Sequence, residues 1–114
     1  MKRLAFLAVA ALVAAAIVLP LATAGGATSV TVKGKEYKFT LSTKSARHGS
    51  VTFKFKNVGK LAHDFKIDGK KTKIIQKGKT ASPLTVKLKK GTYKFLCTIP
   101  GHADQGMKGT FRVT

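Results

Sequence analysis

The sequence predicts an all-β domain, built as an antiparallel sandwich or small barrel of about seven or eight strands. From residue 29 onward, apolar and polar side chains alternate with a period of two, which is typical of strands that bury one face. This part of the chain shows no helical stripe of apolar residues. Turn-forming residues recur at short, even intervals, and this spacing is typical of sandwiches and barrels.

Strand-like segments follow one another in order, separated by turn signals such as Gly34, Asp68-Gly69 and Gly91. They cover residues 30–32, 37–41, 51–55, 61–67, 74–75, 84–88, 93–97 and 111–113. Inward-facing aromatic residues are expected to supply most of the core, namely Tyr37, Phe39, Phe53, Phe55, Tyr93, Phe95 and Phe111. The outward positions are rich in lysine, which also discourages pairing between sheet edges; examples are Lys54, Lys56, Lys87, Lys89 and Lys94.

Residues 1–24 predict an N-terminal signal helix. A basic start precedes an uncharged, Ala-rich run, and Ala22-Thr23-Ala24 has the small residues of a signal cleavage site. The run is also long enough to span a bilayer as an uncleaved anchor. We favour cleavage because Pro20 interrupts the run just before that site. Residues 25–114 then form one small domain, exported to the periplasm or to the extracytoplasmic face of the cell membrane.

The charge balance is strongly basic, with 22 Lys and Arg against 4 Asp and Glu and a formal net charge of +18. Such an excess predicts attraction to acidic protein partners or to an anionic membrane surface. Nucleic acid is not expected as a partner, because an exported protein does not normally meet it. The alternative interpretation is a solvated surface without a specific partner.

The stretch from Cys97 to Met107 carries the chemistry. It holds the single cysteine of the chain, together with His102 and Met107. One cysteine cannot form an internal disulfide, so metal ligation explains an exported thiol better than packing alone does. Alternation with Tyr93 and Phe95 directs Cys97 into the interior. A thiolate, an imidazole and a thioether are ligands that copper prefers, and His63 is the candidate for a second imidazole.

Two alternatives bear on this site. Zinc also binds cysteine and histidine, but structural zinc sites usually have more thiolates and no methionine. Taken singly, His63 and Met107 could be packing residues. The third histidine, His48, lies in a polar turn without a companion ligand and is interpreted as a surface residue.

Two motifs, Asn57-x-Gly59-x3-His63 and Cys97-x4-His102-x4-Met107, resemble those of the cupredoxins, the type 1 blue copper proteins of the plastocyanin and azurin family. The loop spacing is most similar to that of the auracyanin-like members. The resemblance covers nearly all of residues 25–114. It implies a Greek-key β-sandwich with one copper ion that cycles between Cu(I) and Cu(II). His63, Cys97 and His102 would then be the equatorial ligands and Met107 the weak axial ligand.

The resemblance further implies a monomeric carrier of single electrons between redox partners, not an enzyme. His102 is expected to expose one ring edge through a small apolar patch of Leu61, Ile99, Pro100 and Ala103, where acidic redox proteins would dock transiently. The alternative function is a copper carrier or homeostasis module that uses the same site. Asp64 stands where the family usually has asparagine, and Ala62 where azurin has glycine.

Overall fold

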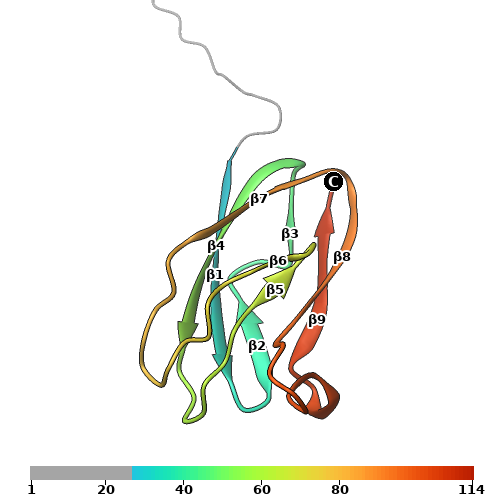
Figure 1. Ribbon diagram of the computed structural model, residues 1–114. Helices are drawn as coiled ribbons and strands as arrows, with labels where there is room; N and C mark the ends of the chain where they lie inside the picture. The colour runs from blue at the N-terminus through green and yellow to red at the C-terminus, as the bar shows by residue number, and fades with distance from the viewer. Residues whose placement is uncertain (1–26) are drawn as a thin grey trace, which may run out of the picture.

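The computed structural model describes residues 27–114, so the predicted signal segment 1–24 lies outside the described residues. Two β-sheets pack face to face (Figure 1). The first sheet has the strand order β2-β1-β4-β7, with bounds β1 Thr28–Lys35, β2 Lys38–Leu41, β4 Gly49–Asn57 and β7 Leu84–Leu88. The second has the order β3-β9-β8-β5-β6, with bounds β3 Ser45–Ala46, β5 Lys66–Ile67, β6 Lys70–Lys71, β8 Gly91–Leu96 and β9 Lys108–Val113.

The predicted fold class is confirmed, with two refinements. Both sheets are mixed, because β1 pairs with β4 and β3 with β9 in parallel, whereas the other pairs are antiparallel. Parallel pairs arise where the chain crosses between the sheets, as it does through β3 on the way from β2 to β4. Three of the strands, β3, β5 and β6, have only two residues each.

The strand predicted at residues 61–67 is wrong over most of its length. Only Lys66–Ile67 is a strand, and His63 forms an isolated bridge in which it exchanges hydrogen bonds with Ile75. The N–H of His63 donates to the Ile75 carbonyl at 3.1 Å, and the N–H of Ile75 donates to the His63 carbonyl at 2.7 Å. Residues 61–65 therefore form a loop, and the predicted edge segment at 74–75 pairs with it only at His63.

Phe65 lies at the centre of the core, although the sequence pattern did not single it out. It is fully buried, and its ring centroid lies 5.2–6.3 Å from those of four other phenylalanines, Phe39, Phe53, Phe55 and Phe95. Two of the predicted core aromatics, Tyr37 and Tyr93, are instead half-buried at its margin. The Tyr93 hydroxyl shows why, since it donates to the Lys89 carbonyl at 2.7 Å and must stay near the surface to do so.

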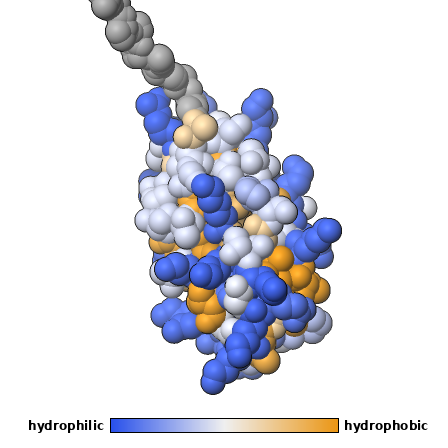
Figure 2. All heavy atoms as spheres, turned by 90° about the vertical axis from the view of Figure 1, so that its left-hand side faces the viewer, coloured by the Kyte–Doolittle hydropathy of each residue, from blue (hydrophilic) through white to orange (hydrophobic). Residues whose placement is uncertain are grey.

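The lysine side chains cover the outside of the sandwich as predicted. Figure 2 shows hydrophilic side chains spread over one broad face, with smaller hydrophobic patches between them. Within residues 27–114, no lysine or arginine forms an ion pair with a carboxylate; the one pair joins Glu36 to His63. In the same part of the chain, no helix is long and apolar enough to cross a membrane.

One end of the sandwich gathers the turns that build the site. The register places Gly34 of β1 beside Asn57 of β4, and Leu96 of β8 beside Lys108 of β9, so these strand ends lie together. The loop between β8 and β9 contains the short 3-10 helix η1 (Ala103–Gln105) and projects from this end (Figure 1).

Candidate metal centre

Cys97 follows directly on β8, and alternation along that strand turns its side chain inward. The residue is 1% exposed and belongs to the buried core. Its N–H donates to the Met107 carbonyl at 3.1 Å, which closes the base of the loop that carries His102. The prediction that Cys97 points into the interior is confirmed.

Hydrogen bonds inside the loop fix the position of His102. Its N–H donates to the Ile99 carbonyl at 3.0 Å, and its carbonyl accepts from the N–H groups of Gln105 and Met107, each at 3.1 Å. Gly106 has φ 117°, a left-handed conformation that favours glycine, and it ends the 3-10 turn. A loop with this many internal bonds holds its side chains in a defined place with little further ordering.

His63 enters the site from the loop that follows β4. Its side chain is fully buried. Asn57, also buried, shapes this loop: its Nδ2 donates to the carbonyls of Leu61 at 2.7 Å and Ile75 at 2.8 Å, and its Oδ1 accepts from the N–H of Gly59 at 2.8 Å. The Asn57 and Gly59 positions of the sequence motif therefore have a structural role in presenting His63.

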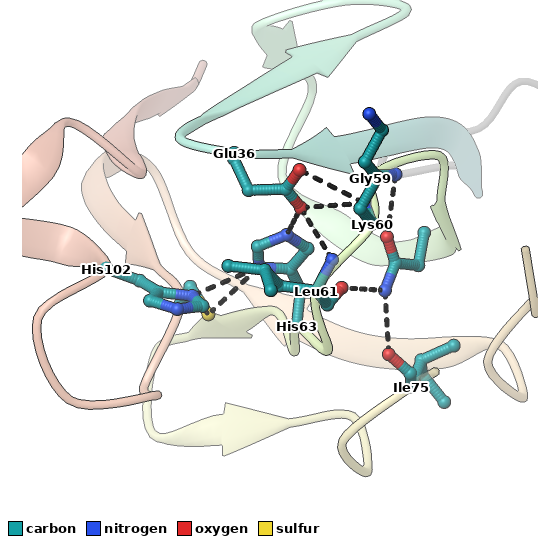
Figure 3. Close-up of polar contacts among 9 residues, drawn as sticks. Glu36, Gly59, Lys60, Leu61, His63, Ile75 and His102 are labelled. Atoms are coloured by element: carbon teal, nitrogen blue, oxygen red, sulfur yellow. Dashed lines mark hydrogen bonds and ion pairs between the residues drawn. The ribbon is translucent and has the colours of Figure 1, made fainter. Parts of the chain in front are cut away.

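The structure brings His63, Cys97 and His102 together, with their ligand atoms within 4.8 Å of one another. The Nδ1 atoms of the two histidines lie 3.1 Å apart. The Cys97 Sγ lies 3.5 Å from His102 Nδ1 and 3.9 Å from His63 Nδ1. One sulfur and two imidazole nitrogens thus lie close enough to share one metal ion. Figure 3 shows the rings of His63 and His102 next to each other.

The fourth predicted ligand, Met107, is fully buried. Its carbonyl accepts from Cys97 and its N–H donates to His102, so its backbone touches both residues. Its methyl group lies near β1, 3.1 Å from the position that a Cβ on Gly34 would occupy. The role of Met107 as an axial ligand remains a prediction.

Burial controls the charge of the ligand side chains. Burial raises the pKa of the Cys97 thiol above its ordinary value. Burial lowers the pKa of His102, and the nearby His63 lowers it further. Without metal, burial therefore favours the neutral forms of Cys97 and His102, and a bound cation would instead favour the thiolate. A thiolate with two imidazoles is a donor set that suits copper.

Asp64 ties the two ligand loops together. It is fully buried, and its carboxylate accepts hydrogen bonds from the N–H of Thr98, at 2.6 Å, and from the Thr98 hydroxyl. Because Thr98 follows Cys97 and Asp64 follows His63, these bonds couple the two ligand positions directly. The aspartate thus accepts from both a backbone donor and a side-chain donor of the Cys97 loop.

His63 and Cys97 are buried, whereas the third residue of the cluster, His102, is half-buried and reaches the surface. In the patch expected around it, Leu61 and Pro100 are exposed, and Ile99 and Ala103 are half-buried. Val58, which is 45% exposed, is a further apolar side chain on the loop that leads to His63. His48 is exposed, and its Nδ1 lies 3.1 Å from the Thr114 carbonyl, outside the cluster, in agreement with its interpretation as a surface residue.

Sequence reasoning missed two contributors, Glu36 and Tyr37, which form the turn between β1 and β2. The Glu36 carboxylate lies 2.7 Å from His63 Nε2, and the Tyr37 ring packs edge-on against His102 with centroids 5.2 Å apart. N–H groups of Leu61 and Lys60, and then His63, lower the pKa of Glu36 from the ordinary 4.5 to about 2. The sequence did contain one signal: Glu36 is one of only four acidic residues in the chain, and it lies at the tip of a hairpin.

The chain belongs to the family of cupredoxin-like domains, whose sequence model matches residues 5–112. The resemblance inferred from the motifs is therefore confirmed. The family and the cluster of His63, Cys97 and His102 together fit one bound copper ion. No curated protein shows significant similarity to the chain.

Solved structures share the fold at low sequence identity. Auracyanin from the photosynthetic bacterium Roseiflexus castenholzii is 21% identical with a TM-score of 0.62, over 81% of this chain and 99% of that one. Rusticyanin from Thiobacillus ferrooxidans is 24% identical with a TM-score of 0.68, over 80% and 79%. Auracyanin A from Chloroflexus aurantiacus, described as a blue copper protein, is 20% identical with a TM-score of 0.63, over 78% and 100%.

Proposed function

We propose that this protein is a type 1 blue copper protein that carries single electrons between redox partners outside the cytoplasm. The observation that carries the proposal is the convergence of one sulfur and two imidazole nitrogens within 4.8 Å in a buried, hydrogen-bonded site. His63, Cys97 and His102 would hold the ion, with Met107 as a weak fourth ligand. Copper, when bound, would supply the one-electron couple between Cu(I) and Cu(II).

The protein would keep the ligands nearly still while the charge of the site changes. His63 is held by its bridge to Ile75, Cys97 by its bond to the Met107 carbonyl, and the two loops are joined through Asp64. Such a fixed cage favours rapid electron exchange because few atoms have to move. The half-buried ring of His102 connects the site to the surface, so electrons would enter and leave through it.

The positive surface charge favours acidic protein partners, which we propose dock transiently around His102. Like charges lie directly opposite each other in the sheets, as at Lys33 and Lys56 and at Lys66 and Lys71, and this arrangement is unfavourable within the protein itself. An acidic partner would neutralise it and would be steered by it at low ionic strength. An anionic membrane surface is a second class of partner; nucleic acid is not proposed.

We also propose that the protein is exported and monomeric, and that it transforms no substrate. Export follows from the signal pattern in residues 1–24. In the part of the chain that the structure describes, one group of His, Cys, Asp and Glu side chains is placed to bind a metal. A single such site with a fixed ligand set suits electron transfer better than substrate turnover.

Addition of Cu(II) to the purified domain tests the proposal. An intense blue absorption band is expected, and Cys97→Ser should abolish it because the band depends on the copper–thiolate bond. His48→Gln is the matched control, since His48 lies outside the cluster and its loss should leave the colour unchanged. A colourless protein that takes up only zinc would refute the proposal.

A copper carrier is the alternative use of the same site, and the partial exposure of His102 would give an acceptor protein access to it. The two functions differ in what leaves the protein. Reversible one-electron cycling at a stable potential, with the copper retained, supports electron transfer. Rapid loss of Cu(I) to a competing chelator under the same conditions supports copper carriage.

A further inference from the structure

We propose that Glu36 is a positioning residue of the metal centre, which sets the hydrogen-bonding state of His63 and holds the loop that presents it. This inference rests on the proposed function, because it assigns a role toward the copper ion. It makes the turn between β1 and β2 a third wall of the site, beside the His63 loop and the loop from Cys97 to Met107.

The Glu36 carboxylate gathers three donors from one loop. Its Oε1 accepts from the N–H groups of Lys60 and Leu61, both at 2.9 Å, and lies 2.7 Å from His63 Nε2. Its Oε2 lies 3.1 Å from the N–H of Lys60. Figure 3 shows these contacts converging on the carboxylate from one side. One side chain of β1–β2 thus holds both the backbone and the ligand ring of the His63 loop.

The contact determines which nitrogen of His63 faces the metal position. A carboxylate that already receives backbone N–H groups can only accept, so His63 Nε2 must carry the hydrogen and donate it. In the neutral ring, Nδ1 then has a free electron pair, and this atom faces His102 Nδ1 and Cys97 Sγ. In the metal-free site, either His102 Nδ1 or the Cys97 thiol can donate to this electron pair. Glu36 keeps the His63 lone pair where a metal can use it.

The surrounding backbone has room for this carboxylate only because residue 59 is glycine. A Cβ at Gly59 would collide with Glu36 Oε1 and would lie 2.9 Å from the Cα of Lys35. The Oδ1 of Asn57 fixes Gly59 from the other side. The Gly59 position of the motif therefore serves the close approach of the His63 loop to the β1–β2 turn.

Tyr37, the next residue of the β1–β2 turn, contacts the second histidine of the site, His102. The Tyr37 ring packs against His102 at an interplanar angle of 69°, so Glu36 and Tyr37 each support one of the two imidazoles. A carboxylate hydrogen-bonded to a ligating imidazole raises its basicity and fixes its orientation. Its negative charge also favours Cu(II) over Cu(I).

Two substitutions separate the hydrogen bond from the charge. Glu36→Gln retains an oxygen that can accept at the Oε1 position but removes the charge, and Glu36→Ala removes both. Asp68→Asn is the matched control, because Asp68 is an exposed carboxylate in the turn between β5 and β6, outside the three walls of the site, and asparagine tolerates its φ of 49°. Circular dichroism and thermal melting establish that each metal-free variant is folded.

Three measurements test the role. In the metal-free wild type, the ¹⁵N NMR shifts of the His63 ring should show hydrogen on Nε2, and Glu36→Ala should show a mixture of tautomers. Glu36→Ala should bind Cu(II) about 10- to 100-fold more weakly than the wild type. Glu36→Gln should raise the reduction potential, by about 59 mV if Cu(II) affinity falls tenfold relative to that for Cu(I). Asp68→Asn should leave all three nearly unchanged.

The outcomes separate this inference from the proposed function. If the wild type binds no copper, the proposed function fails, and the NMR result for the metal-free protein still decides whether Glu36 sets the tautomer. If the wild type is blue but Glu36→Ala keeps its tautomer and its copper affinity within about twofold, only the role of Glu36 is overturned. Should Glu36→Ala fail to fold, Glu36→Gln decides: a reduction potential equal to that of Asp68→Asn refutes the role.

Discussion

Replacement of Asp64 by alanine should loosen the metal centre and destabilise the domain together. The Asp64 carboxylate is buried and accepts from both the N–H and the hydroxyl of Thr98, the residue next to Cys97. In Asp64→Ala these two donors lose their partner. The connection between the His63 loop and the Cys97 loop is lost with them.

The size of the effect follows from the number and type of these bonds. A hydrogen bond to a charged group contributes about 1.5–3 kcal/mol, so the loss of two should lower the free energy of unfolding by about 3 kcal/mol or more. This is a large share of the roughly 5–15 kcal/mol that stabilises a typical domain. Asp64→Asn retains one acceptor oxygen for the Thr98 N–H, so its loss should be about half as large.

Urea denaturation of the metal-free domain measures these differences. Asp104→Ala is the control, because Asp104 is exposed and its loss should change the unfolding free energy by no more than about 0.5 kcal/mol. An unfolding free energy for Asp64→Ala within about 1 kcal/mol of that control would refute the reasoning. After copper loading, Asp64→Ala should also give a weaker or broader blue band than Asp64→Asn.

Three further predictions concern the core, the fourth ligand and acid stability. Phe65→Ala should lower the free energy of unfolding by about 3–5 kcal/mol, because it leaves a cavity among four rings; thermal melting checks this, with Val58→Ala at the surface as the control. Met107→Leu should cost less than about 1.5 kcal/mol of stability yet shift the visible spectrum and the reduction potential, and an unchanged spectrum would contradict an axial role. The lowered pKa of Glu36, about 2, means that its carboxylate contributes stability above pH 4.5 that is lost as the pH falls toward 2. Between pH 4.5 and 2 the free energy of unfolding of the metal-free wild type should therefore fall more than that of Glu36→Gln. Denaturation at each pH measures both values, and equal losses would contradict a lowered pKa of Glu36.

Much of the site could be predicted from local sequence pattern. Cys97 shares the register of Tyr93 and Phe95, and alternation along one strand is enough to direct its sulfur inward. The spacing from Cys97 to His102 and Met107 lies within one short loop, so little tertiary information is needed to place them near each other. His63 was assigned by its residue type and its motif, and the structure brings it to the same point.

The loop around His63 could not be predicted in the same way. The apolar residues of segment 61–67 indicated a strand, but the backbone there is held by the Asn57 side chain and by one bridge to Ile75. These partners come from other parts of the chain, so alternation does not reveal them. For the same reason the pattern did not single out Phe65, whose burial depends on four rings from both sheets.

Strand alternation and motif spacing are local properties, so the fold class, the family and the four candidate ligands could be predicted without coordinates. The surroundings of those ligands depend on tertiary contacts. Glu36 and His63 are 27 positions apart, and they meet because β1 pairs with β4, which sets the β1–β2 turn against the His63 loop. Hydrogen bonds between separate loops depend on which strands are neighbours in a sheet, and alternation within one strand does not specify that order.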